Sequence, residues 1–139
     1  ELFPVTLHRQ LGEDLGARMA HAFEQALEQY AWAIIIGTDC PELGTADLQQ
    51  AADLLRQGTD AVIGPAADGG YYMLGLRRFE PDLFSDMVWG GSGVLEETLQ
   101  RLQQLGMRTR KLDLKHDLDR PEDLHRFPQL PFSFLKGIC

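Results

Sequence analysis

Two short apolar runs, separated by an amphipathic stretch, constrain the fold more than any other feature of this sequence. The runs 33–36 (AIII) and 61–63 (AVI) are rich in β-branched residues, which is typical of strands that are buried on both faces. The stretch between them carries apolar residues at helical spacing, namely Leu48, Ala51, Ala52 and Leu55. A strand, a helix and a second strand in this order favour a mostly parallel sheet with helices on both faces.

The same alternation continues along the chain. Helical patterns predict a helix over 15–30, a second that Thr45 caps and that ends near Gly58, a third over 94–105 and a short one over 120–127. Strand patterns cover 71–76 and 108–112, and a turn over 65–70 precedes the strand 71–76. A chain of 139 residues is long enough to bury one core. We therefore predict a single α/β domain over residues 1–139, built as a three-layer sandwich.

The most informative motifs follow the predicted strands. GTDCP follows the strand 33–36, GPAADGG follows the strand 61–63, and DLDRPED follows the strand 108–112. Because open α/β sheets bind ligands beyond the carboxyl ends of their strands, these three loops are expected to converge on one site. Within the strand 71–76, strict alternation places Tyr72 and Leu74 on one face and Tyr71 and Met73 on the other.

Charge and composition exclude several classes of protein. The net charge of -8 argues against a nucleic-acid partner, since such binding rests on a basic face that neutralises phosphates. No apolar run approaches the roughly 18 residues of a membrane span, and no signal-peptide pattern opens the chain. With only Cys40 and Cys139, the sequence implies no disulfide framework. These features predict a cytoplasmic protein without a membrane partner.

Asp39 is the first candidate metal ligand. It comes directly after a predicted buried strand and precedes Cys40 and Pro41, so its carboxylate is expected at the rim of the ligand crevice. Magnesium typically takes one or two protein carboxylates and fills its other positions with water and phosphate oxygens. The alternative is that Asp39 only caps a turn, as aspartate often does before proline.

Asp117 and Asp119 form the second acidic pair. In an extended HDLD segment both carboxylates lie on the same side, which suits a shared cation. Asp119 could equally be the N-cap of the short helix that begins at Arg120, and a capping aspartate still keeps a free lone pair.

Two glycine-rich segments are candidates for substrate contacts. In DGGYY, Asp68 precedes Gly69 and Gly70, where backbone freedom lets a substrate approach closely; an ordinary hairpin turn explains the same residues. In WGGSG, Gly91 and Ser92 precede a predicted helix, whose free N–H groups attract phosphate or carboxylate; a flexible loop is an equally good account.

Four other polar residues have a structural alternative that we prefer. His116 could bind metal or move a proton, but a single histidine is more often a solvated side chain. Cys40 fits a small buried residue better than a nucleophile, since no basic partner adjoins it. Arg77 and Arg78 fit surface charges better than phosphate contacts.

Taken together, five motifs resemble one bacterial family in order and spacing over residues 10–124, namely QLGEDLGARM, GTDCPEL, DAVIGPAADGGYYMLGL, WGGSG and DLDRPEDL. This is the glycosyltransferase-like family described as radical-SAM/selenodomain-associated transferase 1, or arsenosugar-biosynthesis-type glycosyltransferases. The chain is more distantly similar to 2-phospholactate and molybdenum-cofactor guanylyltransferases. The resemblance implies the GT-A fold of nucleotide-diphospho-sugar transferases.

The resemblance also implies roles for individual residues. Asp39 and Asp119 match the metal-binding and catalytic aspartates, with Asp117 as a further metal ligand beside Asp119. Gly91 and Ser92 match the loop that meets the acceptor or its phosphate, although WGGSG is poorer in threonine and serine than the loop of close members. The stretch 10–16, which includes Gln10 and Asp14, would lie near the nucleotide base.

The beginning of the chain departs from the family pattern. Members normally start with a strand and a loop of proline, glycine, lysine and arginine residues that hold the donor nucleotide, and nothing before Leu2 matches them. We therefore expect this chain to lack the donor element and to have little activity alone. An apolar sheet edge left open in this way also predicts a homo-oligomer.

The function that follows is a transferase that depends on Mg²⁺ or Mn²⁺ and moves a glycosyl or nucleotidyl group. Its expected partners are a nucleotide or nucleotide-sugar donor and a small-molecule acceptor. The alternative is a non-catalytic module of the same fold that binds a nucleotide or metabolite, since a fold by itself does not fix function.

Overall fold

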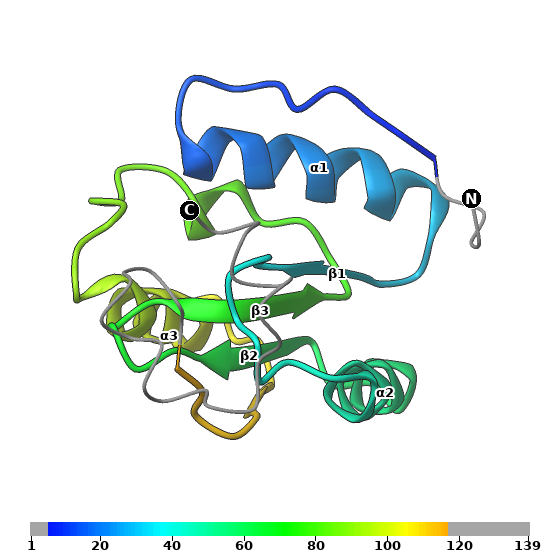
Figure 1. Cartoon of the computed structure of the whole chain (residues 1–139). Helices are drawn as coiled ribbons and strands as arrows, with labels where there is room; N and C mark the ends of the chain where they lie inside the picture. The colour runs from blue at the N-terminus through cyan, green and yellow to red at the C-terminus, as the bar shows by residue number, and fades with distance from the viewer. Residues whose placement is uncertain (1–5, 117–139) are drawn as a thin grey trace.

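The computed structural model describes residues 6–116 and shows an α/β arrangement (Figure 1). Its elements are α1 (Leu15–Gln29), β1 (Ala33–Ile36), α2 (Thr45–Arg56), β2 (Ala61–Pro65), β3 (Tyr71–Leu76), the 3-10 helix η1 (Pro81–Leu83), α3 (Val94–Gln104) and β4 (Thr109–Lys111). The helix expected over 120–127 lies outside these residues. Within residues 6–116, no helix is both long and apolar enough to cross a bilayer.

The four strands form one mixed sheet in the order β1-β3-β2-β4. β3 runs antiparallel to both β1 and β2, whereas β2 and β4 are parallel. β1, β2 and β4 therefore share one direction, as a mostly parallel sheet requires, but the insertion of β3 makes two of the three pairings antiparallel. The reason is the tight turn between β2 and β3, because so short a connection can join only antiparallel neighbours.

A β-bulge reverses the alternation predicted for β3. Gly64 pairs with Met73 and Pro65 pairs with Tyr71, so Tyr72 is an extra residue on the bulged strand. Tyr72 consequently packs on the same side of the sheet as Met73, and Tyr71 lies on the opposite side. The predicted faces of the two tyrosines are wrong, because one inserted residue shifts every side chain beyond it to the other face.

The core is divided between the two faces of the sheet. On one face, α1 and α3 contribute residues such as Phe23 and Leu102, which pack against the inward side chains of β2 and β3. On the other face, α2 contributes Ala51 and Leu55, which pack against Val62 and Met73. Helices therefore cover both faces, as the sequence predicts.

The first turns of α1 and α2 are stabilised by aspartates. Asp14 is the N-cap of α1, and its Oδ1 accepts the Ala17 N–H at 2.7 Å. In α2 the N-cap is Gly44, so the prediction that Thr45 caps this helix is wrong. Asp47 takes over part of the capping, because its Oδ2 accepts the Gly44 N–H at 2.9 Å.

Candidate functional site

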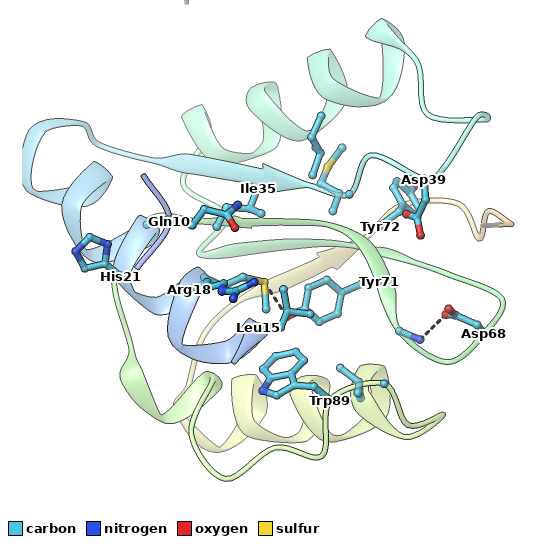
Figure 2. Close-up of a pocket in the computed structure, with 18 of the residues that line it drawn as sticks. Gln10, Leu15, Arg18, His21, Ile35, Asp39, Asp68, Tyr71, Tyr72 and Trp89 are labelled. Carbon is cyan, nitrogen blue, oxygen red and sulfur yellow. Dashed lines mark hydrogen bonds between the residues drawn. The ribbon is translucent and has the colours of Figure 1, made fainter. Parts of the chain in front are cut away.

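A cavity of about 740 Å³ lies at the carboxyl end of β1 (Figure 2). The end of β1 and the beginning of β3 form one wall, α1 forms a second, and the segments 8–10 and 89–91 complete the lining. Because β3 is antiparallel to β1, its first residues lie at the same edge of the sheet as the last residues of β1. The volume is within the range of ordinary small-molecule sites.

Tyr71 forms much of the apolar surface of this cavity. Its ring packs with the cluster that contains Phe23 and Leu74, and its hydroxyl donates a 3.8 Å hydrogen bond to Met19 Sδ on α1. Burial raises the pKa of Tyr71 above its ordinary value, so the phenol stays uncharged at neutral pH. Tyr71 can therefore offer a ligand a ring surface but no negative charge.

Trp89 is held against the first turn of α1. Its Nε1 is the buried side-chain polar atom in residues 6–116 that has no hydrogen-bond partner. A Cβ at position 16 would lie 2.5 Å from this nitrogen and 2.7 Å from the Phe84 carbonyl oxygen, so only glycine fits there. Close packing against Gly16 fixes the indole, which lines the cavity opposite Tyr71.

Asp39 stands exposed at the rim of the cavity, three residues after the end of β1. The Gly37 N–H donates to the Tyr72 carbonyl at 2.8 Å, so the hydrogen bonding between β1 and β3 continues one residue into the loop that carries Asp39. The Asp39 carboxylate makes no hydrogen bond or ion pair with residues 6–116. A carboxylate that is anchored by a strand but has no local partner is suited to a ligand.

The loops after β1, β2 and β4 are joined by hydrogen bonds. Lys115 N–H donates to the Pro65 carbonyl at 3.0 Å, and its carbonyl accepts from Ala67 N–H at 2.8 Å. The Glu42 Oε1 accepts the His116 N–H at 2.9 Å and lies 3.2 Å from His116 Nδ1. The three motif-bearing loops therefore meet at one edge of the sheet, at least as far as His116. Asp117 and Asp119, the next predicted ligands along the chain, lie outside the described residues.

Cys40 and His116, for which a structural role was preferred, both lie where the loops after β1 and β4 meet. The thiol of Cys40 is buried and donates to the His116 carbonyl at 3.8 Å, so it packs the β1 loop against the β4 loop. The side chain of His116 is 43% exposed and pairs with Glu42, and within residues 6–116 it belongs to no group of metal ligands. Both contacts are structural ones.

The DGGYY segment forms the tight turn between β2 and β3. Asp68 Oδ1 accepts the Gly70 N–H at 2.9 Å, and both residues line the cavity. Gly69 has a φ of +95° and lies so close to the Ser92 carbonyl that no side chain would fit. Its own carbonyl accepts the Leu95 N–H at 2.8 Å, which ties the turn to the start of α3. Asp68 and Gly69 thus have structural roles in addition to any contact with substrate.

The other predicted substrate contacts divide into two groups. Gln10 and Gly91 line the cavity, whereas Asp14 caps α1 and Ser92 packs against Gly69 outside the cavity lining. The Leu95 N–H at the start of α3 is already bonded to Gly69, so this helix N-terminus has fewer free donors than the WGGSG pattern predicts.

Arg77 and Arg78 bind main-chain carbonyls. Arg77 Nη1 donates to the Leu55 carbonyl, and Arg78 Nη2 donates to the Leu105 carbonyl at 2.9 Å. Arg78 also pairs with Glu80 at 3.0 Å. Neither arginine lines the cavity, in keeping with the structural interpretation of this pair.

The described residues offer few protein ligands for a divalent metal ion. Residues 6–116 contain no group of three or more histidine, cysteine, aspartate or glutamate side chains that could hold a metal. Such a group is the signature of zinc or calcium sites, whereas magnesium needs one or two carboxylates. Asp39 supplies one, and this is compatible with a hard cation that is completed by phosphate oxygens and water.

Sequence comparison relates the chain to a bacterial family. The family described as "Uncharacterized protein conserved in bacteria (DUF2064)" matches residues 4–91, more than half of the chain. The chain belongs to this family. None of the curated proteins matches it.

Structural comparison relates this chain to a known fold. A crystal structure from Desulfovibrio desulfuricans G20, described as a "putative nucleotide-diphospho-sugar transferase" at 1.90 Å resolution, is 34% identical and superposes with a TM-score of 0.79. The alignment covers 90% of this chain and 56% of that chain. The chain therefore has a nucleotide-diphospho-sugar-transferase-like fold and spans little more than half the length of that protein.

Several cavity residues were not predicted from the sequence, chiefly Arg18, Met19, His21, Tyr71 and Trp89. Met19 is buried and lies at the junction of core and cavity. Arg18 and His21 are its neighbours on α1 and also line the cavity. Helical spacing does not show which polar side chains of a helix face another element. Trp89 could have been noticed as a large aromatic residue directly before two glycines.

Proposed function

We propose that this protein is a metal-dependent transferase that uses a nucleotide-activated donor and moves a glycosyl or nucleotidyl group. The observation that carries the proposal is the position of Asp39: a carboxylate with no partner among residues 6–116, at the rim of a cavity and on the carboxyl edge of a transferase-like sheet. The meeting of the β1 and β4 loops at His116 and Glu42 supports it, since Asp117 follows His116 in the sequence.

In this proposal, Asp39 and the pair Asp117 and Asp119 would hold Mg²⁺ or Mn²⁺, and the ion would supply positive charge for the donor phosphates. The protein's own part is to orient the two substrates and exclude water between them. In glycosyl transfer, an acceptor oxygen bonds to the sugar carbon, the carbon–phosphate oxygen bond breaks, and the nucleoside diphosphate leaves as the acceptor proton is released. In nucleotidyl transfer, an acceptor phosphate oxygen bonds to the α-phosphorus and pyrophosphate leaves.

The first test is binding of donors with and without metal. Thermal unfolding is measured with UDP-, GDP- and other nucleotide sugars and nucleoside triphosphates, in the presence of Mn²⁺ or of EDTA, on this chain and on the full-length gene product. A donor that stabilises the protein only with Mn²⁺ supports the proposal, because ligands stabilise the state that they bind. Release of nucleoside diphosphate or of pyrophosphate then distinguishes the two reactions. Stabilisation by a nucleotide with no turnover of any donor would instead favour a binding module.

The second test removes the proposed metal ligand. Asp39→Asn keeps the size of the side chain but removes its charge, so Mn²⁺-dependent donor binding should weaken about tenfold or more, as measured by calorimetry. Asp86→Asn is the matched control, because Asp86 does not line the cavity and asparagine tolerates its φ of 55°. Equal metal-dependent binding by the Asp39 variant and the control would show that Asp39 is only a turn residue.

A further inference from the structure

The charged side chains of the cavity are separated by sign. Asp39 and Asp68 lie at one end, whereas Arg18 and His21 project from α1 toward the other (Figure 2). Arg9 also lines the cavity and precedes Gln10, which lies on the Arg18 side in the same view. The two ends of the cavity thus differ in chemistry, with carboxylates where the proposed metal binds and the Arg18 guanidinium, beside the His21 imidazole, away from it.

This cationic end is unusual for the protein as a whole. The chain has 21 acidic residues against 13 lysines and arginines, so a randomly placed surface would be negative. The cavity lining nevertheless contains two arginines against two aspartates, together with two histidines and no glutamate, so its formal charge is balanced. A solvated helix face would account for one arginine, but it does not explain why basic residues of two separate segments, 8–9 and α1, line the same cavity.

The side chain of Arg18 is exposed and contacts the backbone of Gly12. Its Nε donates to the Gly12 carbonyl at 3.3 Å, which anchors the guanidinium at the start of α1. The Asp14 carboxylate, four residues earlier, accepts the Ala17 N–H, whereas the Asp14 carbonyl accepts the Arg18 backbone N–H at 3.0 Å. The terminal nitrogens of Arg18 make no hydrogen bond or ion pair with residues 6–116. They form a planar pair of donors, the arrangement that fits a carboxylate or a phosphate.

The surface between the two charged ends is apolar. Tyr71, Trp89, Met19 and Leu15 line it, and Tyr71 is uncharged. Leu15 is 53% exposed even though it opens the buried side of α1. Rigid aromatic surfaces of this kind favour a ring or another flat apolar body, which gains by leaving water.

We propose that the acceptor is a small organic anion with an apolar, ring-containing body. Its carboxylate or phosphate binds Arg18, with Arg9 and His21 beside it, and its body lies against Tyr71 and Trp89. Its reacting group then points toward Asp39 and the donor. The role as acceptor rests on the proposed transferase function and departs from the expectation that the stretch 10–16 lies near the nucleotide base. The binding of such an anion depends on neither.

The test uses phenyl phosphate as the probe, with inorganic phosphate and phenol as its two halves. Calorimetry on the whole chain, without metal or nucleotide, should show that phenyl phosphate binds more tightly than either half. Arg18→Gln should weaken this binding about tenfold or more, because a charge-assisted pair is lost. Arg18→Lys should fall between the two, since it keeps the charge but not the planar pair.

Two controls separate this inference from the transferase proposal. Arg110→Gln removes an exposed arginine of β4 outside this cavity and should leave phenyl phosphate binding unchanged. Asp39→Asn should preserve or strengthen phenyl phosphate binding while it weakens Mn²⁺-dependent donor binding. Thermal unfolding confirms that each variant is folded.

Each outcome bears on one of the two claims. Undiminished binding by a folded Arg18→Gln variant, or an equal loss in Arg110→Gln, overturns the anion site. Competition between phenyl phosphate and a saturating nucleotide sugar with Mn²⁺ overturns the assignment to the acceptor, because the donor would then occupy the same end. Arg18-dependent binding of phenyl phosphate, with no donor binding by either this chain or the full-length gene product, supports the anion site and contradicts the transferase proposal.

Discussion

Tyr71 and Tyr72 are neighbours in β3, but they belong to two sides of the sheet that are filled very differently. Tyr72 is 2% exposed; its ring packs against Gly64, its hydroxyl donates to the Asp113 carbonyl at 2.9 Å, and the Lys115 ammonium lies 5.8 Å from the ring centroid. Tyr71 is only partly buried, its hydroxyl meets a weak sulfur acceptor, and its outer surface borders the cavity. Tyr72 also contributes to the cavity lining, but it is almost completely buried in the α2-side core, whereas the α1-side core opens into the cavity beside Tyr71.

The difference indicates how the fold divides stability from binding. The Tyr72 side joins the loop after β4 to the sheet, and Lys115 also pairs with Asp47 at 3.4 Å in a poorly exposed position. Burial first, and then the nearby Asp47 carboxylate, raise the pKa of Tyr72, so its phenol stays protonated and keeps donating. The rigid side thereby fixes the loops that carry Asp39 and His116. The α1 side can then contain a cavity without loss of the fold.

The largest expected contrast comes from truncating each tyrosine. Tyr72→Ala should lower the free energy of unfolding by about 3–5 kcal/mol, because it leaves a cavity in a closed core. Tyr71→Ala should lower it by no more than about 2 kcal/mol, since one side of that ring already borders open space and no new enclosed void results. Urea denaturation measures both. A larger effect at Tyr71 would show that the α1 side is the tightly packed one.

A smaller effect on stability is expected from adding a methyl group at position 16, beside Trp89. Gly16→Ala should destabilise the protein by about 1–3 kcal/mol and change the tryptophan fluorescence, because the new methyl group overlaps Trp89 Nε1. The sign is informative, since alanine is intrinsically better than glycine in a helix by about 1 kcal/mol. Gly93→Ala is the control, as no atom lies within 4 Å of its added Cβ. Stabilisation by Gly16→Ala would mean that the indole has room to move.

The smallest expected contrast comes from removing only the two hydroxyl groups. Tyr72→Phe loses the bond to the Asp113 carbonyl and should cost about 0.5–1.5 kcal/mol. Tyr71→Phe loses only a 3.8 Å contact with sulfur and should change stability by less than about 0.5 kcal/mol. Thermal unfolding at neutral pH compares the two variants. Equal losses would show that the loop after β4 is held without help from Tyr72.

The sequence predicted the elements well, because their signals are local. The run of isoleucines at 34–36, the apolar stripe of α2 and the pattern of α3 each depend on residues within a few positions of one another. Asp39 was correctly expected just beyond β1, since its place follows from the end of that strand. Its role as a metal ligand, like the roles of Asp117 and Asp119, is still a prediction.

What the sequence alone determined was therefore the order and type of the elements and the loops that follow them, because periodicity and turn residues act over short distances. The tertiary structure decided the rest. It placed β3 between β1 and β2, used the bulge at Tyr72 to exchange the faces of two tyrosines, and brought Arg18, Tyr71 and Trp89 around one cavity. These outcomes depend on pairing and packing between residues far apart in the chain, and no local pattern encodes which distant partner fills a given space.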